Sequence, residues 1–209
     1  MSVELLHMDC MDYMKDLPDN AFDLAIVDPP YGINVNISMG RRKGQKHSGH
    51  HKYAGGYKDA PNAEYFDQLK RVSKNQIIWG ANHFISRIPK PVDSPCWVMW
   101  DKGFSDEVTF AQFELAWTSY TSTCKKFDKP PNDQYRIHPT QKPVKLYEWL
   151  LKNYAKEGDR ILDTHLGSGS SAIAAHYGGF DFVGMELDED YYKAACERFD
   201  NETAQKAMF

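Results

Sequence analysis

The sequence lacks any long apolar run. No stretch reaches the roughly 18 residues that a membrane-spanning helix requires, and the opening MSVELLHMDC lacks the basic end and long apolar centre of a signal peptide. Internal repeats and low-complexity tracts are absent as well, while 42% of residues are hydrophobic and 26% charged. That composition excludes a fibrous or disordered chain and favours a cytoplasmic globular protein.

Cysteine is scarce, and no two cysteines form a C-x-x-C pair. The four cysteines lie far apart, at Cys10, Cys96, Cys124 and Cys196. This spacing suggests neither a zinc site nor a disulfide framework. We therefore expect reduced cysteines with a packing role and no metal centre.

An excess of positive charge is also missing, since the net charge is −4. This argues against a protein coated uniformly for nucleic acid. One segment departs from the average: residues 41–52, RRKGQKHSGHHK, carry five basic residues and no acid, which leaves −9 on the remainder. The segment has no apolar period and lies in a loop at about 33–61, and loops of that length are usually functional or disordered. By composition alone, a solvated loop and a nucleic-acid-binding arm remain equally open.

Short apolar runs rich in β-forming residues alternate with amphipathic stretches along all 209 residues. This alternation predicts an α/β fold in a single domain, 1–209, with a doubly wound and mostly parallel sheet. Seven strands are predicted, at 3–8, 22–27, 75–79, 96–100, 113–119, 160–164 and 180–185. Helices are predicted near 11–17, 62–73, 144–156, 170–177 and 188–199, the last with Asp188 as its N-cap. Ligands of such sheets bind at the carboxyl ends of the strands.

A glycine-rich turn follows the predicted strand at 160–164. It reads DTHLGSGS (163–170) and runs directly into a predicted helix, so a ligand can approach the backbone at that helix end. About 20 residues later Glu186 ends the next strand, where a carboxylate can accept both hydroxyls of a ribose. The pattern predicts a nucleoside-cofactor site. It also fits the G-x-G-x-x-A of a dinucleotide fold through Gly167, Gly169 and Ala172, or a tight turn beside a surface acid.

The predicted strand at 22–27 ends in Asp28-Pro29-Pro30-Tyr31-Gly32. Two consecutive prolines restrict the backbone and remove two N–H donors, so the neighbouring carbonyls are presented as acceptors. A carboxylate beside such a carbonyl can accept both hydrogens of an exocyclic amino group, and a tyrosine ring offers a stacking face. The motif predicts a pocket for a flat aromatic amine, although it can also simply terminate a strand.

Together these motifs resemble those of the amino-group DNA methyltransferases that use S-adenosylmethionine. DPPYG matches the family's catalytic motif, DTHLGSGS its cofactor loop and Glu186 its ribose-binding acid. Asp9 resembles the acid that contacts the cofactor adenine, and HPTQKP (138–143) resembles the segment lining the methionine end. The order, with the catalytic motif before the cofactor loop, is that of the circularly permuted β group with a Rossmann-like, seven-stranded fold. A nicotinamide oxidoreductase would leave DPPYG and HPTQKP unexplained.

The chain departs from the family pattern in two places. Thr164 and His165 replace Pro and Phe in the cofactor loop, and Ser170 replaces Thr, from which we expect altered cofactor affinity without loss of binding. The target-recognition region, at about 120–137, is short, so we expect the basic loop to assist in site choice.

The resemblance implies direct methyl transfer to the N6 amino group of an adenine that has been flipped out of duplex DNA. Alternatives are an N4-cytosine enzyme, which more often carries Ser first in the catalytic motif, and a non-catalytic DNA-binding module. The family also suggests a homodimer. The implied catalytic residues are Asp28, Pro29, Pro30 and Tyr31. The implied cofactor-binding residues are Asp9, Asp28, His138, Thr140, Gln141, Lys142, Asp163, His165, Gly167, Ser168, Gly169, Ser170, Glu186 and Leu187. The predicted DNA contacts are Arg41, Arg42, Lys43, Lys46, Lys52, Lys125, Lys126, Lys129 and Arg136.

Overall fold

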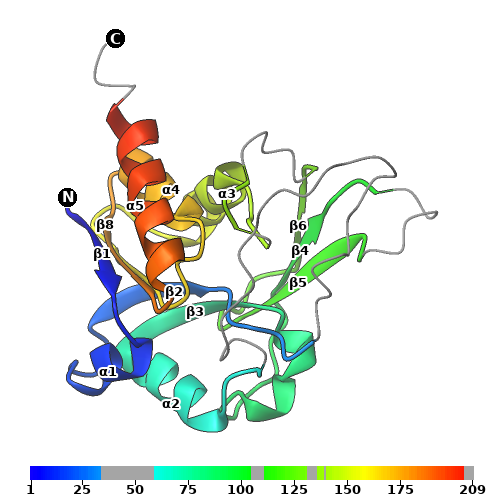
Figure 1. Ribbon diagram of the computed structural model, residues 1–209. Coiled ribbons are helices and arrows are strands. Elements are labelled where there is room, and N and C mark those ends of the chain that lie inside the picture. The colour runs from blue at the N-terminus through cyan, green and yellow to red at the C-terminus, as the bar shows by residue number, and fades with distance from the viewer. Residues whose placement is uncertain (34–58, 105–110, 131–135, 139, 205–209) are drawn as a thin grey trace.

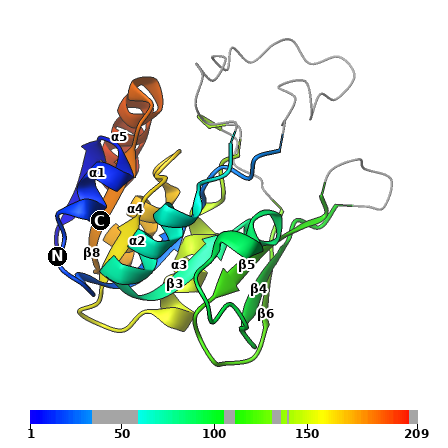
Figure 2. The same ribbon diagram turned by 90° about the horizontal axis from the view of Figure 1, so that it is seen from below.

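The computed structural model describes residues 1–33, 59–104, 111–130, 136–138 and 140–204. Within them, one eight-stranded sheet has helices on both faces (Figures 1 and 2). The strand order is β1-β8-β7-β2-β3-β5-β4-β6, and within the described residues β5 alone runs antiparallel to its neighbours. The strands are β1 (Val3–His7), β2 (Phe22–Val27), β3 (Ser73–Trp79), β4 (Trp97–Asp101), β5 (Phe113–Thr118), β6 (Lys125–Asp128), β7 (Arg160–Asp163) and β8 (Asp181–Glu186). The predicted α/β, doubly wound fold is confirmed.

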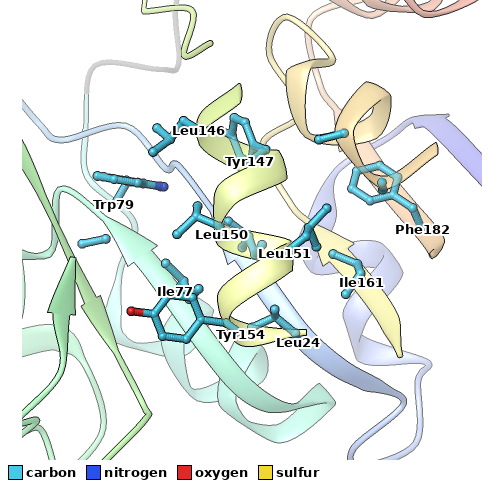
Figure 3. Close-up of a cluster of buried hydrophobic side chains, with 14 of the residues drawn as sticks. Leu24, Ile77, Trp79, Leu146, Tyr147, Leu150, Leu151, Tyr154, Ile161 and Phe182 are labelled. Carbon is cyan, nitrogen blue, oxygen red and sulfur yellow. The ribbon is translucent and has the colours of Figure 1, made fainter. Parts of the chain in front are cut away.

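The central strand β2 is buried on both faces, because its side chains alternate between two separate cores. Leu24 and Ile26 pack in the core beneath α3 (Val144–Tyr154) and α4 (Ser170–Gly178), which Figure 3 shows, whereas Ala25 and Val27 pack in the core beneath α2 (Ala63–Val72). The helices are α1 (Cys10–Lys15), α2 (Ala63–Val72), α3 (Val144–Tyr154), α4 (Ser170–Gly178) and α5 (Glu189–Ala204), with short 3₁₀ turns η1 (Ala81–His83) and η2 (Ile85–Arg87). A strand covered on both faces needs a continuous apolar run, and FDLAIV supplies one.

Asp188 caps the last helix as predicted. Its Oδ1 accepts the backbone N–H groups of Asp190 and Tyr191, both at 3.0 Å, so two of the donors left unpaired at the start of α5 are satisfied. Glu189 and Asp190 follow in the first turn, where the helix dipole favours acids. The cap places the start of α5 directly after the end of β8.

The number of strands corrects the sequence prediction, since β6 is an eighth strand inside the region expected to recognise the target. Its sequence, KKFD, is short and charged, and its exposure alternates along the strand. Phe127 alone presents a large apolar side chain, which packs 5.6 Å from the Trp149 ring of α3. An edge strand is held mainly by backbone hydrogen bonds to one neighbour, here β4, so it needs no apolar pattern that a sequence could reveal.

None of the described helices is long and apolar enough to cross a membrane.

Candidate active site

The sheet brings the two sequence motifs to the same edge. β2 and β7 are adjacent and parallel, with Leu24 opposite Ile161 and Ala25 opposite Leu162, so DPPYG and the glycine loop leave the sheet side by side. β8 lies on the other side of β7 and ends at Glu186. Three motifs that are far apart in the sequence therefore meet at the carboxyl ends of neighbouring strands, where open α/β sheets bind ligands.

Glu186 holds the glycine loop in place. Its carboxylate is 5% exposed, and Oε2 accepts the N–H of Gly167 at 2.9 Å while Oε1 accepts the N–H of Asp188 at 3.0 Å. The loop needs its glycines, because Gly169 has φ +74° and a Cβ there would lie 3.3 Å from the carbonyl oxygen of Ala195. A carboxylate has about four acceptor positions, and the two hydroxyls of a ribose are donors of the kind that such a group accepts.

Asp163, at the end of β7, is almost fully buried. Its carboxylate accepts the N–H of His165 at 3.0 Å and the hydroxyl of Ser171 at 2.5 Å. Burial raises the pKa of Asp163 from 3.8 to about 7, although both hydrogen bonds oppose that change. Ser171 did not stand out in the sequence, because a serine in the first turn of a helix is common without any function.

Replacing Asp163 with asparagine is expected to stabilise the protein, increasingly as the pH rises from about 4 to 7. The native carboxyl stays protonated over that range while the unfolded one ionises, so the wild-type protein loses stability with rising pH and the variant does not. The shift from 3.8 to about 7 corresponds to roughly 4 kcal/mol at 1.36 kcal/mol per pKa unit. Urea unfolding of both proteins between pH 4 and 8 measures the difference.

Asp23→Asn is the matched control for that experiment. Lys74, 2.6 Å from Asp23, and the N–H of Arg160 lower the pKa of this carboxyl, so its contribution should stay constant above pH 5. If the difference between wild type and Asp163→Asn were the same at every pH, the raised pKa of Asp163 would be wrong.

His165, which stands where the family has an aromatic ring, is packed as a neutral imidazole. Burial lowers its pKa to about 4. The ring lies edge to face against Tyr65 at 5.4 Å, and its Nδ1 is 2.9 Å from the hydroxyl of Thr164, which is itself 2.6 Å from the Tyr65 hydroxyl. Thr164 and His165, the two replacements in the loop, thus form one hydrogen-bonded group with Tyr65 of α2. Nothing in the sequence indicated that Tyr65 lies beside this loop.

The HPTQKP segment folds over the glycine loop. The His138 ring lies 3.7 Å from where a Cβ on Gly167 would stand, and it packs edge to face on Tyr191 of α5 at 4.5 Å. His138 Nδ1 is also 3.1 Å from the Thr140 hydroxyl. Gln141 is buried and accepts the N–H of Ile137 at 3.1 Å. The segment therefore closes on the predicted cofactor loop at its His138 end.

At its other end the same segment reaches the catalytic motif. Lys142 Nζ lies 2.5 Å from Asp28 Oδ2 and 2.9 Å from Glu114 Oε2, and Lys102 Nζ lies 2.5 Å from Glu114 Oε1. The Tyr31 hydroxyl is 2.7 Å from Asp28 Oδ1 and 3.1 Å from Glu114 Oε2. We call these five residues the acid–lysine cluster.

Opposing effects set the charges of the acid–lysine cluster. Burial raises the pKa of Asp28, while Lys142 opposes that rise. Burial also acts to raise the pKa of Glu114, but the ammonium groups of Lys142 and Lys102 outweigh it and lower the value to about 2. The two carboxylates raise the pKa of Lys142 against the effect of burial. The cluster brings the carboxyl groups of Asp28 and Glu114 within 2.5 to 2.9 Å of the amino groups of Lys142 and Lys102.

Tyr31 is held by its neighbours as well as by its hydroxyl. Its ring stacks on His83 at 5.2 Å with an interplanar angle of 17°. It also lies so close to Gly80, which has φ +68°, that a Cβ there would come 2.1 Å from the ring. A glycine at the end of β3 is thus required for the tyrosine of DPPYG to occupy this position.

Other predicted site residues lie apart from the acid–lysine cluster. Asp9 caps α1 by accepting the N–H of Met11 at 2.7 Å, and Leu187 is 53% exposed. Ser168 and Ser170 lie in the loop with their hydroxyl oxygens 3.1 Å apart. Pro29 is buried and Pro30 half-buried at the end of β2.

Of the predicted DNA-binding residues within the described chain, Lys125, Lys126 and Lys129 lie on or directly after β6, and Arg136 lies beside Gln141. Lys126 lies 2.8 Å from Asp128 and 3.5 Å from Asp101, and Lys125 donates to Asn153 at 2.8 Å. Lys129 follows β6, and Arg136 is exposed with one N–H directed at the Gln141 carbonyl, 3.4 Å away. The carboxylates beside Lys126 reduce its value as a phosphate contact. Arg41, Arg42, Lys43, Lys46 and Lys52 lie outside the described residues.

Sequence reasoning missed Glu114 and Lys102. Glu114 lies in the strand predicted at 113–119, and a carboxylate inside the apolar run FELAWTS is a signal that could have identified it. Lys102 follows β4 and offers no comparable signal. Among the described residues, no group of His, Cys, Asp and Glu side chains is arranged to hold a metal ion.

Solved methyltransferases share this fold. M1.HpyAVI, in its complex with SAM, is 20% identical, with a TM-score of 0.59 over 94% of this chain and 100% of that one. PvuII DNA methyltransferase, described as cytosine-N4-specific, is 12% identical, with a TM-score of 0.63 over 98% of this chain and 92% of that one. This likeness shows a Rossmann-like fold of the α/β class.

The sequence comparison gives the family. Residues 57–197 match the model of the N6/N4 DNA methylases (N6_N4_Mtase, DNA methylase), which is well over half of the chain, so the protein belongs to this DNA methylase family. A relative that carries the name methylase YubD, from Escherichia coli (strain K12), is 27% identical over 96% of this chain and 90% of its own length. The family predicted from the motifs is confirmed, and the protein is a DNA methyltransferase.

Proposed function

We propose that the protein transfers a methyl group from S-adenosylmethionine to the N6 amino nitrogen of adenine in DNA. The observation that carries this proposal is the position of Asp28, at the end of β2 and directly beside the strand that leads into the glycine loop. A base bound at Asp28 and a cofactor bound at that loop would be neighbours. Proximity of this kind is what a direct transfer between two bound molecules requires.

The loop after β7 has the features that this cofactor needs. Gly167 and Gly169 carry no side chains of their own, α4 begins at Ser170, and the Glu186 carboxylate accepts the N–H of Gly167 within the loop. The cofactor supplies a methyl group on a positively charged sulfur. We propose that it is held by Asp9, Asp28, His138, Thr140, Gln141, Lys142, Asp163, His165, Gly167, Ser168, Gly169, Ser170, Glu186 and Leu187.

The catalytic task of the chain is to make an amino nitrogen nucleophilic, because its lone pair is delocalised into the base. Asp28 and the Pro29 carbonyl, by accepting the two amino hydrogens, would favour the pyramidal geometry that localises the lone pair. The carboxylate also stabilises the positive charge that develops on this nitrogen during transfer. We propose that Tyr31 stacks on the base once it has left the duplex, which offsets part of an unstacking cost of a few kcal/mol.

The choice of adenine rests on Asp28, since the N4-cytosine enzymes of the family more often have serine at this position. N4-methylation of cytosine is the second candidate function, because the fold is similar to that of PvuII, a cytosine-N4-specific enzyme. Both bases present an amino group, so the pocket chemistry described for Asp28 serves either.

Digestion of treated DNA to nucleosides is expected to show N6-methyldeoxyadenosine. DNA from a host free of methylation would be incubated with the protein and S-adenosylmethionine and analysed by mass spectrometry. N4-methyldeoxycytidine as the sole product would overturn the adenine assignment. Methylation of neither base would favour a non-catalytic DNA-binding module.

We further propose that the five basic residues of 41–52 contact DNA phosphates, helped by Lys125, Lys126, Lys129 and Arg136. The support is electrostatic: the segment carries +5 in a chain that otherwise sums to −9, and a body of that charge repels a duplex. Because phosphate contacts carry little sequence information, these residues would contribute affinity more than site choice. A homodimer stays a prediction from the family.

A further inference from the structure

Lys142 is the most completely bonded cation in the acid–lysine cluster. An ammonium group has three N–H donors, and here each has an acceptor: Asp28 Oδ2 at 2.5 Å, Glu114 Oε2 at 2.9 Å and the Tyr31 hydroxyl at 3.2 Å. The side chain is 2% exposed. A charge buried this deeply persists only when it is paired, so Lys142 is held by these acceptors.

The contacts of Lys142 are those that the proposed function assigns to a base. Lys142 on Oδ2 and Tyr31 on Oδ1 already donate to Asp28, so an incoming amino group competes with them for the same carboxylate. Lys142 Nζ also lies over aromatic rings, 5.7 Å from the centre of Tyr31 and 5.3 Å from that of Trp79. A nitrogen bearing several hydrogens, bonded to Asp28 and close to the Tyr31 ring, imitates the amino group of a stacked base.

Glu114 offers the ammonium a second position. Lys102 binds Oε1 of Glu114 and keeps this carboxylate ionised and oriented, with Oε2 directed at Lys142. If Lys142 leaves Asp28 it can keep its ion pair with Glu114, which avoids the large cost of an unpaired buried charge. The cluster carries two negative and two positive charges, so the entry of a neutral base leaves that balance unchanged.

We propose that Lys142 occupies the amino-group position on Asp28 until a target base arrives, and that it then moves onto Glu114. This inference rests on the proposed function and goes beyond it, because it makes Lys142 and Glu114 positioning residues for base entry. Neither residue takes part in the methyl transfer. Lys142 keeps Asp28 ionised and satisfied in the absence of DNA, and Glu114 makes the exchange possible.

A double-mutant cycle tests the exchange through steady-state methylation of DNA at varied DNA concentration. Glu114→Gln should raise KM for DNA at least about tenfold with a smaller change in kcat, because Lys142 then has no charged alternative to Asp28. Lys142→Met vacates the position, so Glu114 no longer matters in that background. The double variant should have the same KM for DNA as Lys142→Met alone. The effects of the two substitutions on KM would then be strongly non-additive.

The pH profile provides an independent readout. In Lys142→Met the acidic limb of the activity profile should move to higher pH, because Asp28 has lost the cation that favours its ionised form. Lys74→Met is the control, because it removes a lysine that lies 2.6 Å from Asp23 of β2, outside the acid–lysine cluster. It should change neither KM nor the pH profile. Lys142→Gln, which keeps an amide donor for Asp28, takes the place of Lys142→Met in the cycle if the latter does not fold.

The outcomes separate this inference from the function on which it rests. Failure of the wild-type protein to methylate DNA would overturn both. An active wild type with additive effects of Glu114→Gln and Lys142→Met on KM would overturn the exchange alone and reduce the cluster to a structural ion network. Non-additive KM values together with a shifted acidic limb would support the exchange.

Discussion

Asp28→Asn is expected to lower the rate of methyl transfer by at least about a hundredfold, the usual effect of removing one group that stabilises a developing charge. The amide keeps the shape of the side chain and one oxygen acceptor, but it lacks the negative charge that favours the reacting amino nitrogen. Cofactor affinity should change less than the rate, because Asp28 is only one of the residues proposed to hold the cofactor, and Glu186 and the glycine loop are unchanged in the variant. Single-turnover methylation and calorimetric titration with S-adenosylmethionine measure the two quantities separately.

Two controls distinguish chemistry from folding in that experiment. Asp23→Asn changes an ion-paired acid at the opposite end of the same strand and should leave the methylation rate unchanged. Tyr31→Phe keeps the ring and removes the hydroxyl that donates to Asp28, so it should cost less than Asp28→Asn. A wild-type rate in a folded Asp28→Asn protein would mean that the base does not bind at this carboxylate.

Glu186→Ala is expected to weaken cofactor binding at least about tenfold. A hydrogen bond to a charged group contributes roughly 1.5 to 3 kcal/mol, and the variant loses the acceptor proposed for two ribose hydroxyls. It also loses the bonds to Gly167 and Asp188, so the loop and the start of α5 lose their connection. Calorimetric titration with S-adenosylmethionine reports the affinity, and thermal unfolding shows whether the variant is folded.

A second substitution separates ribose binding from loop support. Glu186→Gln keeps one oxygen for a backbone N–H, so it should preserve the loop better than alanine while still losing the negative acceptor. Glu189→Ala removes an exposed acid whose surface pair with Lys193 at 2.6 Å contributes little, and it should bind the cofactor normally. Unchanged affinity in a folded Glu186→Ala protein would refute the assignment of the ribose site.

Local sequence patterns predicted the buried parallel strands best, together with the helices and their caps. FDLAIV was predicted at 22–27 and forms β2 at Phe22–Val27, because a strand covered on both faces needs an unbroken apolar run. The strands around the motifs agree within a residue or two, and the predicted helices are all present. Asp188 was predicted as an N-cap because short acids accept the first free N–H groups of a helix.

Local sequence patterns did not predict the elements and ion pairs that depend on residues distant in the sequence. β6 forms because the edge of β4 can pair with it, and the residues of β6 themselves show no alternation of apolar side chains. Glu114 could be assigned to a strand, but nothing in FELAWTS indicates that Lys102 and Lys142 would pair with it. The place of Lys142 in HPTQKP predicts a cofactor contact, and it gives no sign of the 2.5 Å ion pair that Lys142 makes with Asp28, the proposed catalytic acid.

Local sequence patterns were enough to give the class of this protein, through the alternation of strands and helices, the motif order and the residue types at each strand end. These are local properties, since side-chain periodicity, proline and glycine act on the chain within a few residues of themselves. Which charged side chains meet depends on the three-dimensional packing of the chain. Asp28 and Lys142 are 114 positions apart, and the crossovers that place β2 beside β7 and β3 beside β5 bring them within 2.5 Å. Side-chain contacts across such distances depend on the packing of the whole sheet, because no local preference specifies them.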